Sequence, residues 1–201
     1  MGEYRENRIE EIKAHVVGLS MGGFIALELA RRYPELVHSV FATGAHPFGG
    51  IYKWRSSRPV TIRLLLCLLH SMLDRLYWWL PSRYDMARHE VLKAEMDKNR
   101  TWATVRDNYT SILDFGWDKV REINVRIAVI VASLHGDIEA TRKMGPLLRE
   151  GGSEESRVFV MRNAVYAWNL QFPELFALGI RAWIEGKELP KEFEELYITS
   201  K

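Results

Sequence analysis

Residues 18–22 read Gly-Leu-Ser-Met-Gly, which places one serine between two glycines in a G-x-S-x-G pattern. The short, β-branched segment 15–17 precedes it and predicts a strand. Residues 24–32 follow it, are rich in Ala and Leu, and repeat apolar residues at helical spacing. A strand–turn–helix setting is the context in which the serine of this pattern acts as a nucleophile. The alternative is a glycine-rich turn without chemistry.

The tightness of such a turn has consequences for the residues in it. We expect Ser20 to adopt a strained backbone, and we expect a side chain at Gly18 or Gly22 to collide with its neighbours. The hydroxyl of Ser20 then projects at the carboxyl edge of a sheet. The amide of Met21, at the start of the following helix, is the predicted oxyanion donor.

The elements that must position Ser20 follow from the rest of the chain. Strand patterns are found at residues 14–18, 36–43, 126–132 and 157–161, and helical patterns at 138–149 and 173–185. Alternating strands and helices predict an α/β fold with a mainly parallel sheet, in which these four strands are neighbours in chain order. Residues 50–118 show no strand pattern. They are rich in Trp, carry an apolar stripe over 62–80, and predict helices at 87–96 and 102–113.

Composition limits the class of protein. The chain has 201 residues, 47% of them hydrophobic, a net charge of +2 and one cysteine, which indicates a single domain with a sizeable core. These values argue against nucleic acid or an anionic membrane as partner, against a disulfide framework and against a thiolate metal cluster. The start of the chain does not resemble a targeting signal. The most hydrophobic stretch, residues 61–80, contains charged residues, so it is not expected to span a membrane. We therefore expect a cytoplasmic protein without metal or cofactor.

Several segments together resemble the α/β-hydrolase family: residues 15–23, 42–44, 127–132, 167–169 and 173–176. The resemblance implies that residues 1–49 and 119–201 form the hydrolase core and that 50–118 form a helical cap. It also implies serine-dependent hydrolysis of a small-molecule, ester-like substrate, with Ser20 as nucleophile and no cofactor. Aromatic residues in the cap would either line a site for an apolar substrate or simply pack its core.

The acid of the family's serine–acid–histidine set corresponds to the neighbourhood of Asp137. The family's usual glycine-to-acid spacing, counted from Ser133, reaches Gly136, so Asp137 is one residue out of register. Asp137 is also well placed to cap the helix that begins at residue 138, and one residue can serve in both ways.

The position of the family's histidine is occupied by Tyr166. A tyrosine has an ordinary pKa near 10 and no ring nitrogen with a free lone pair, so it is a poor base at neutral pH. None of the six histidines follows the last predicted strand. His135, beside the acid loop, could face the pocket, and a solvated loop histidine is its alternative. His46, after the second strand, could line the cleft, and a histidine without a role in the site is its alternative.

The family places further strands, and a loop with a second oxyanion donor, before the serine turn, where this sequence has only a short segment. We therefore expect a fragment-like core, or one completed by a partner, whose strand 14–18 is an exposed edge prone to self-association. Two functions remain open: a serine hydrolase impaired by Tyr166 or given its base from elsewhere, and a non-catalytic hydrolase-like remnant or binding module.

Overall fold

The computed structural model describes residues 13–49, 79, 83, 84, 86, 89–99 and 101–196, with the side chains at 96, 102, 105 and 109 excepted. Most of the apolar stripe predicted over 62–80 lies outside these residues. The elements below therefore belong to the described part of the chain.

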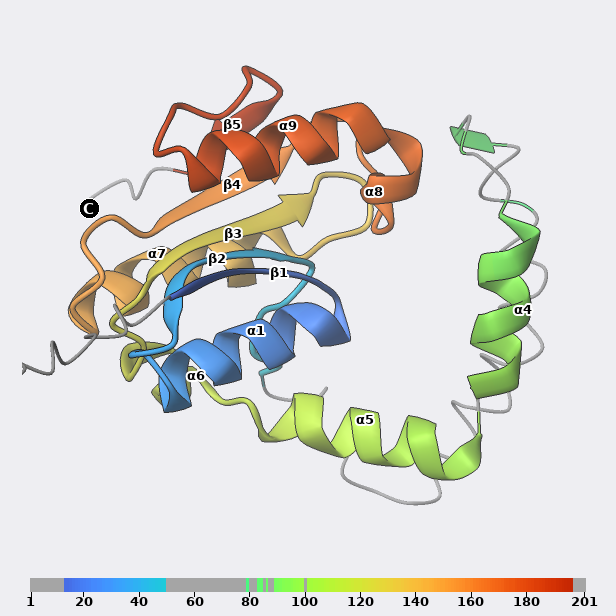
Figure 1. Cartoon of the computed structure of the whole chain (residues 1–201), viewed down its shortest axis with the longest axis horizontal. Coiled ribbons are helices and arrows are strands. Elements are labelled where there is room, and N and C mark those ends of the chain that lie inside the picture. The colour runs from blue at the N-terminus through green and yellow to red at the C-terminus, as the bar shows by residue number, and fades with distance from the viewer. Residues whose placement is uncertain are drawn as a thin grey trace, which may run out of the picture.

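A five-stranded sheet forms the centre of the molecule, in the order β1-β2-β3-β4-β5 (Figure 1). β1 (Ala14–Leu19), β2 (Val37–Thr43), β3 (Arg126–Ala132) and β4 (Arg157–Met161) are parallel neighbours, as predicted. β5 (Phe193–Glu195) was not predicted; it pairs with β4 in the antiparallel direction. Because β1 to β4 run in parallel, their carboxyl ends share one edge of the sheet, and Ser20 follows β1 there.

Helices cover both faces of the sheet (Figure 1). One face packs against α1 (Met21–Arg32), α6 (Trp117–Arg121) and α7 (Ile138–Glu150), and the other against α8 (Trp168–Gln171) and α9 (Pro173–Ile184). Alternate residues of the strands feed the two cores: Val40 and Ala42 face α1, whereas Phe41 faces α9. The α/β fold predicted from the sequence, a mainly parallel sheet flanked by helices, is therefore the fold of the chain.

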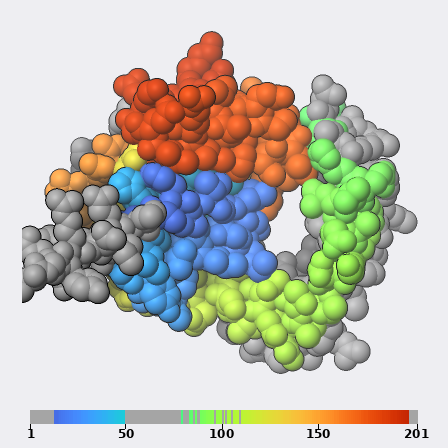
Figure 2. Space-filling view, in the orientation of Figure 1, coloured from blue at the N-terminus to red at the C-terminus, as the bar shows by residue number. Residues whose placement is uncertain are grey.

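Burial falls from the middle of the sheet toward β1. β3 is buried along nearly its whole length, as expected for a strand covered on both faces. β1 pairs with β2 on one side, and among the described residues no strand pairs with its other side. Val17 of β1 is 41% exposed, and the strand is visible at the surface between α1 and α9 (Figure 2).

In the described part of the chain between β2 and β3, two helices precede α6: α4 (Glu90–Asn99) and α5 (Trp102–Asp114). Both were predicted, and no strand is found between β2 and β3 in the described residues. Just after α5, Phe115 packs edge-on against Phe24 of α1, with ring centroids 5.7 Å apart. α4 stands opposite the carboxyl edge of the sheet (Figure 1). No helix among the described residues is long and apolar enough to cross a bilayer.

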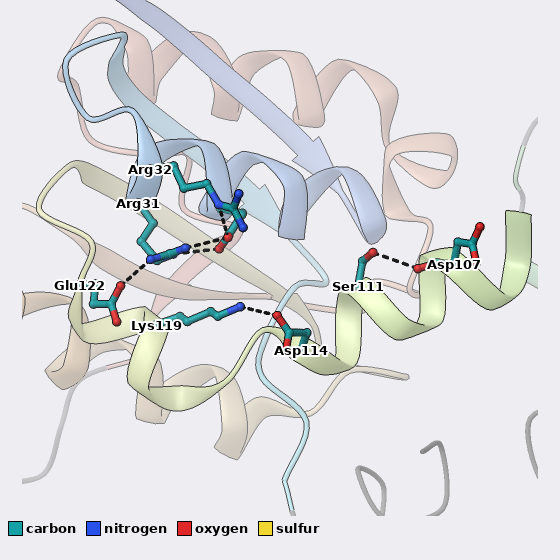
Figure 3. A network of polar contacts seen from close by, with 8 residues as sticks. Arg31, Arg32, Asp107, Ser111, Asp114, Lys119 and Glu122 are labelled. Carbon is teal, nitrogen blue, oxygen red and sulfur yellow. Dashed lines mark hydrogen bonds and ion pairs between the residues drawn. The ribbon is translucent and has the colours of Figure 1, made fainter. Parts of the chain in front are cut away.

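A network of charges joins α1 to α6 at the surface (Figure 3). The carboxylate of Glu28 accepts hydrogen bonds from Arg31 at 2.8 and 2.9 Å and from Arg32 at 2.6 Å. Arg31 also pairs with Glu122, directly after α6, at 2.5 Å. The hydrogen bonds from the two arginines lower the pKa of Glu28 to about 2. The network therefore joins the last turn of α1 to the residue that follows α6.

Candidate active site

A single residue joins β1 to α1. Ser20 follows Leu19, the last residue of β1, and precedes Met21, the first of α1. Its φ of 56° and ψ of −120° lie outside the regions that non-glycine residues ordinarily adopt. The strained backbone predicted for this turn is therefore present, and such strain is concentrated at functional sites.

The predicted crowding around the glycines of this turn is found at one of the two positions. A Cβ on Gly18 would lie 2.2 Å from the carbonyl oxygen of Gly22, so the prediction for Gly18 is confirmed. The prediction for Gly22 is wrong, because a Cβ there would have no atom within 4 Å. The crowded neighbour is Gly23, whose Cβ would lie 2.7 Å from the Cβ of Ala45. Gly22 points into open space, whereas Gly23 faces the segment that follows β2.

The hydroxyl of Tyr166 reaches the serine. It donates to Ser20 Oγ at 2.8 Å and lies within hydrogen-bond distance, 3.1 Å, of the carbonyl oxygen of Gly44. Gly44 has a φ of 63°, and a Cβ there would lie 3.0 Å from the Tyr166 ring. A glycine at 44 thus suits both the backbone turn and the space for the tyrosine. The structure brings together Ser20 and Tyr166, which are 146 positions apart.

The protons of this cluster limit its chemistry. A phenol has one proton, which it can give to Ser20 or to Gly44 at any moment. In the first case Tyr166 donates to the oxygen that would have to attack. In the second, the Ser20 hydroxyl can donate to the phenol oxygen. Neither arrangement takes the proton away from Ser20, which is the task of a general base.

The end of β2 connects both sides of the site. The carbonyl oxygen of Thr43 accepts from the Ser20 amide at 2.8 Å, and its hydroxyl accepts from the indole N–H of Trp168 at 2.8 Å. The amide of Gly44 donates to the carbonyl of Ile130 in β3 at 3.0 Å. The sequence did not predict the contacts of Thr43 and Trp168 beside the site. The signal that could have found Thr43 is a polar side chain directly after the apolar run 40–42 at the end of β2.

Asp137 is the N-cap of α7. Its carboxylate accepts from the amide of Ala140 at 2.9 Å, which is the capping role considered from the sequence. In the described part of the chain no hydrogen bond joins Asp137 to Ser20 or Tyr166. The preceding turn requires a glycine, because a Cβ on Gly136 would lie 2.2 Å from Val131 and 2.5 Å from the carbonyl oxygen of Ala132.

The two histidines considered as substitute bases have other neighbours. His135 is exposed, and its ring lies edge-on to Tyr84 with centroids 5.9 Å apart. His46 is half-buried beside Phe48, at a centroid distance of 5.5 Å. Within the described residues, neither is hydrogen-bonded to Ser20, and no group of three or more His, Cys, Asp or Glu side chains is arranged to hold a metal.

Met21 has the position expected of an oxyanion donor. It is the first residue of α1, and the first amides of an α-helix have no acceptor within the helix. The positive end of the helix dipole adds to the attraction for an anion at this point. The geometry therefore combines one hydroxyl on a strained turn, one amide at a helix N-terminus and one phenol at the same edge of the sheet.

Comparisons with known proteins agree with this architecture. Residues 11–62 match the family model described as "alpha/beta hydrolase fold". An AB hydrolase superfamily protein of Gibberella zeae is 26% identical over 189 residues, which cover 90% of this chain and 59% of that protein. The chain thus spans less than two thirds of the curated relative that it matches.

Solved structures share the fold at lower sequence identity. E-2-(acetamidomethylene)succinate hydrolase has a TM-score of 0.63 and 16% identity, over 86% of this chain and 67% of that one. For a hydrolase from Pseudomonas aeruginosa the TM-score is 0.60 at 18% identity, over 88% and 66% of the two chains. The enol-lactonase from Burkholderia xenovorans LB400 has a TM-score of 0.53 and 20% identity, over 87% and 65%. At these identities the likeness establishes the fold alone.

Proposed function

The chain is an α/β-hydrolase fold protein, and from this premise we propose that its site is a serine-hydrolase site for ester-like compounds in which Tyr166 replaces the general base. Ser20 is the proposed nucleophile and the Met21 amide the proposed oxyanion donor. The observation that carries the proposal is the 2.8 Å hydrogen bond from Tyr166 to Ser20 Oγ. A site built in this way turns over esters far more slowly than one with a complete triad.

The reason lies in what the third group of a triad does. The base takes the serine proton during attack and then gives it to the leaving group. Imidazole does both because one ring nitrogen accepts the serine proton while the other donates a hydrogen bond to the acid. A phenol has one oxygen and offers no such pair of atoms. Removing the base of a triad costs on the order of a millionfold in turnover. Asp137, exposed and engaged as a helix cap, is the proposed acid of the parent arrangement.

A second function, a non-catalytic binding module, is favoured by one feature of the same site. Ser20 and Tyr166 are joined by a hydrogen bond of 2.8 Å between their hydroxyls. A hydroxyl pair of this kind can offer donors to a carbonyl group without reacting with it. The two functions differ in whether Ser20 can ever form a covalent bond.

The test is covalent labelling of Ser20 with a fluorophosphonate probe, together with turnover of a p-nitrophenyl ester. For the unmodified chain we expect no ester turnover above background and no labelling. Tyr166→His should produce weak labelling, because it supplies an imidazole at the position whose side chain now contacts Ser20. Tyr166→Phe is the matched control, since it removes the phenol without adding a base.

The outcomes separate the candidates. Labelling in Tyr166→His that disappears in the double variant with Ser20→Ala supports the hydrolase-like site. No labelling in any variant supports the binding module. Robust labelling of the unmodified chain, abolished by Ser20→Ala, would contradict the role given to Tyr166. It would make His135 the first substitute base to test.

A further inference from the structure

Thr43 lies between the serine turn and the loop that carries Tyr166. Its backbone carbonyl accepts from the Ser20 amide, and its side-chain hydroxyl accepts from the Trp168 indole, both at 2.8 Å. Thr43 is 1% exposed and Trp168 is completely buried. Thr43 of β2 therefore contacts Ser20 through its backbone and, through its side chain, Trp168, which is two residues after Tyr166.

Packing alone does not fix the direction in which Trp168 points. Its indole is surrounded by Phe176 and Phe193, with ring centroids 4.8 and 5.6 Å away. Such ring contacts depend less on direction than a hydrogen bond does. They hold the indole in the core, but they oppose a small sliding or rotation of the ring only weakly. The indole N–H has one acceptor, Thr43 Oγ1, and a buried donor left without an acceptor costs free energy.

Trp168 is two residues after Tyr166, so a movement of its backbone moves the tyrosine as well. We propose that Thr43 is a positioning residue: by fixing Trp168, its hydroxyl sets the side chain at position 166 against Ser20. This inference rests on the proposed function, because it concerns the same site. It adds that the side chain facing the serine is placed by a buried hydrogen bond of the residue two positions further along the chain.

The chain offers a matched control on the same strand. Ser39 is also 1% exposed, lies on the same face of β2 as Thr43, and has its hydroxyl 2.8 Å from Nδ1 of His15. It lies toward the opposite end of the strand from Ser20. Ser39→Ala therefore removes a buried hydroxyl from β2 without touching the site. Thr43→Val removes the acceptor and keeps the shape, Thr43→Ser keeps the acceptor, and Trp168→Phe removes the donor.

The first measurement does not depend on activity. In the full chain labelled with 3-fluorotyrosine, the ¹⁹F signal of Tyr166 is assigned by its loss in Tyr166→Phe. Ser20→Ala then gives the position of that signal when the contact with the serine is absent. We expect Thr43→Val and Trp168→Phe to move the signal from the unmodified position toward the Ser20→Ala position. Thr43→Ser and Ser39→Ala should leave it in place.

The second measurement uses the Tyr166→His background and the fluorophosphonate probe. Small displacements of a catalytic group reduce rates steeply, so Thr43→Val should slow labelling by roughly tenfold to a hundredfold. Thr43→Ser and Ser39→Ala should stay within about twofold of the background rate, because neither displaces the histidine. A purely structural role would make Thr43→Val and Ser39→Ala equally harmful.

The two measurements fail independently. If Tyr166→His is never labelled, the proposed function is wrong, and the ¹⁹F signal still decides whether Thr43 positions residue 166. If the signal stays in place in both Thr43→Val and Trp168→Phe, the positioning role is wrong whatever the labelling shows. Should Thr43→Val fail to fold, Trp168→Phe tests the same hydrogen bond from its other end.

Discussion

Alanine substitutions at the glycines of the serine turn should have opposite effects on stability. The built Cβ of Gly18 lies 2.2 Å from the carbonyl oxygen of Gly22, 2.3 Å from its carbonyl carbon and 2.6 Å from the Gly23 amide nitrogen. All three atoms belong to the backbone, so no side chain can rotate away. Ordinary contact begins near 3.4 Å, so the start of α1 would have to move by about 1 Å, as in severe overpacking.

The magnitudes follow from this geometry. Overpacking typically costs about 1–3 kcal/mol, and because the obstacle here is backbone we expect Gly18→Ala to cost about 3 kcal/mol or more. For a domain of this size that corresponds to a fall in Tm of roughly 6–12 °C. Gly22→Ala meets open space and replaces a poor helix former, so it should change stability by less than about 1 kcal/mol, in the stabilising direction.

Urea denaturation followed by circular dichroism measures both effects on one scale. Gly23→Ala is a third point, and its contact with Ala45 predicts a loss of about 1–3 kcal/mol. We expect the free energy of unfolding to decrease in the order Gly22→Ala, unmodified chain, Gly23→Ala and Gly18→Ala. A Gly22→Ala variant as unstable as Gly18→Ala would refute this account of the turn.

Three further predictions concern other parts of the molecule. Glu28 has a pKa lowered to about 2 by Arg31 and Arg32; its contribution to stability is therefore present above the unfolded value near 4.5 and is lost as pH falls toward 2. Glu28→Gln should cost about 1–2 kcal/mol at pH 6 and little at pH 2, and an equal cost at both would contradict this. Asp137→Ala should lose about 1 kcal/mol of N-cap stabilisation while Asp137→Asn retains most of it, and equal losses in thermal denaturation would count against capping. Among the described residues no strand pairs with the outer side of β1, and Val17 is 41% exposed, so the chain should self-associate in light scattering; Val17→Lys should reduce this, and a monomeric unmodified chain would contradict it.

The parts of the fold that the sequence could predict are those with a local signal. Each parallel strand is an apolar, β-branched run, and the Asp137 cap depends on residues three positions apart. The contact between Ser20 and Tyr166 was approached only through a resemblance, because nothing local to either residue points to the other. The three-residue strand β5 is too short to show a period.

The failures have a common physical cause. Whether a side chain fits at Gly23 is decided by Ala45, which belongs to another segment. The hydrogen bond between Thr43 and Trp168 joins residues 125 positions apart, and a threonine at the end of a strand has many local uses. Contacts of this kind are set by the packing of the sheet with its helices, so a single sequence does not display them.

The wide spacing of the site's partners along the chain also affects how it folds. The contacts at the end of β2 span 122, 125 and 146 positions, and closing such long loops comes at a large entropic cost before the contacts can repay it. β4 pairs with β3 and precedes Tyr166 and Trp168, so we expect these contacts to form only after β4 has reached β3. We therefore expect the cluster around Ser20 to assemble after the parallel strands, and a probe placed there to report completion of the native topology rather than the formation of any one element.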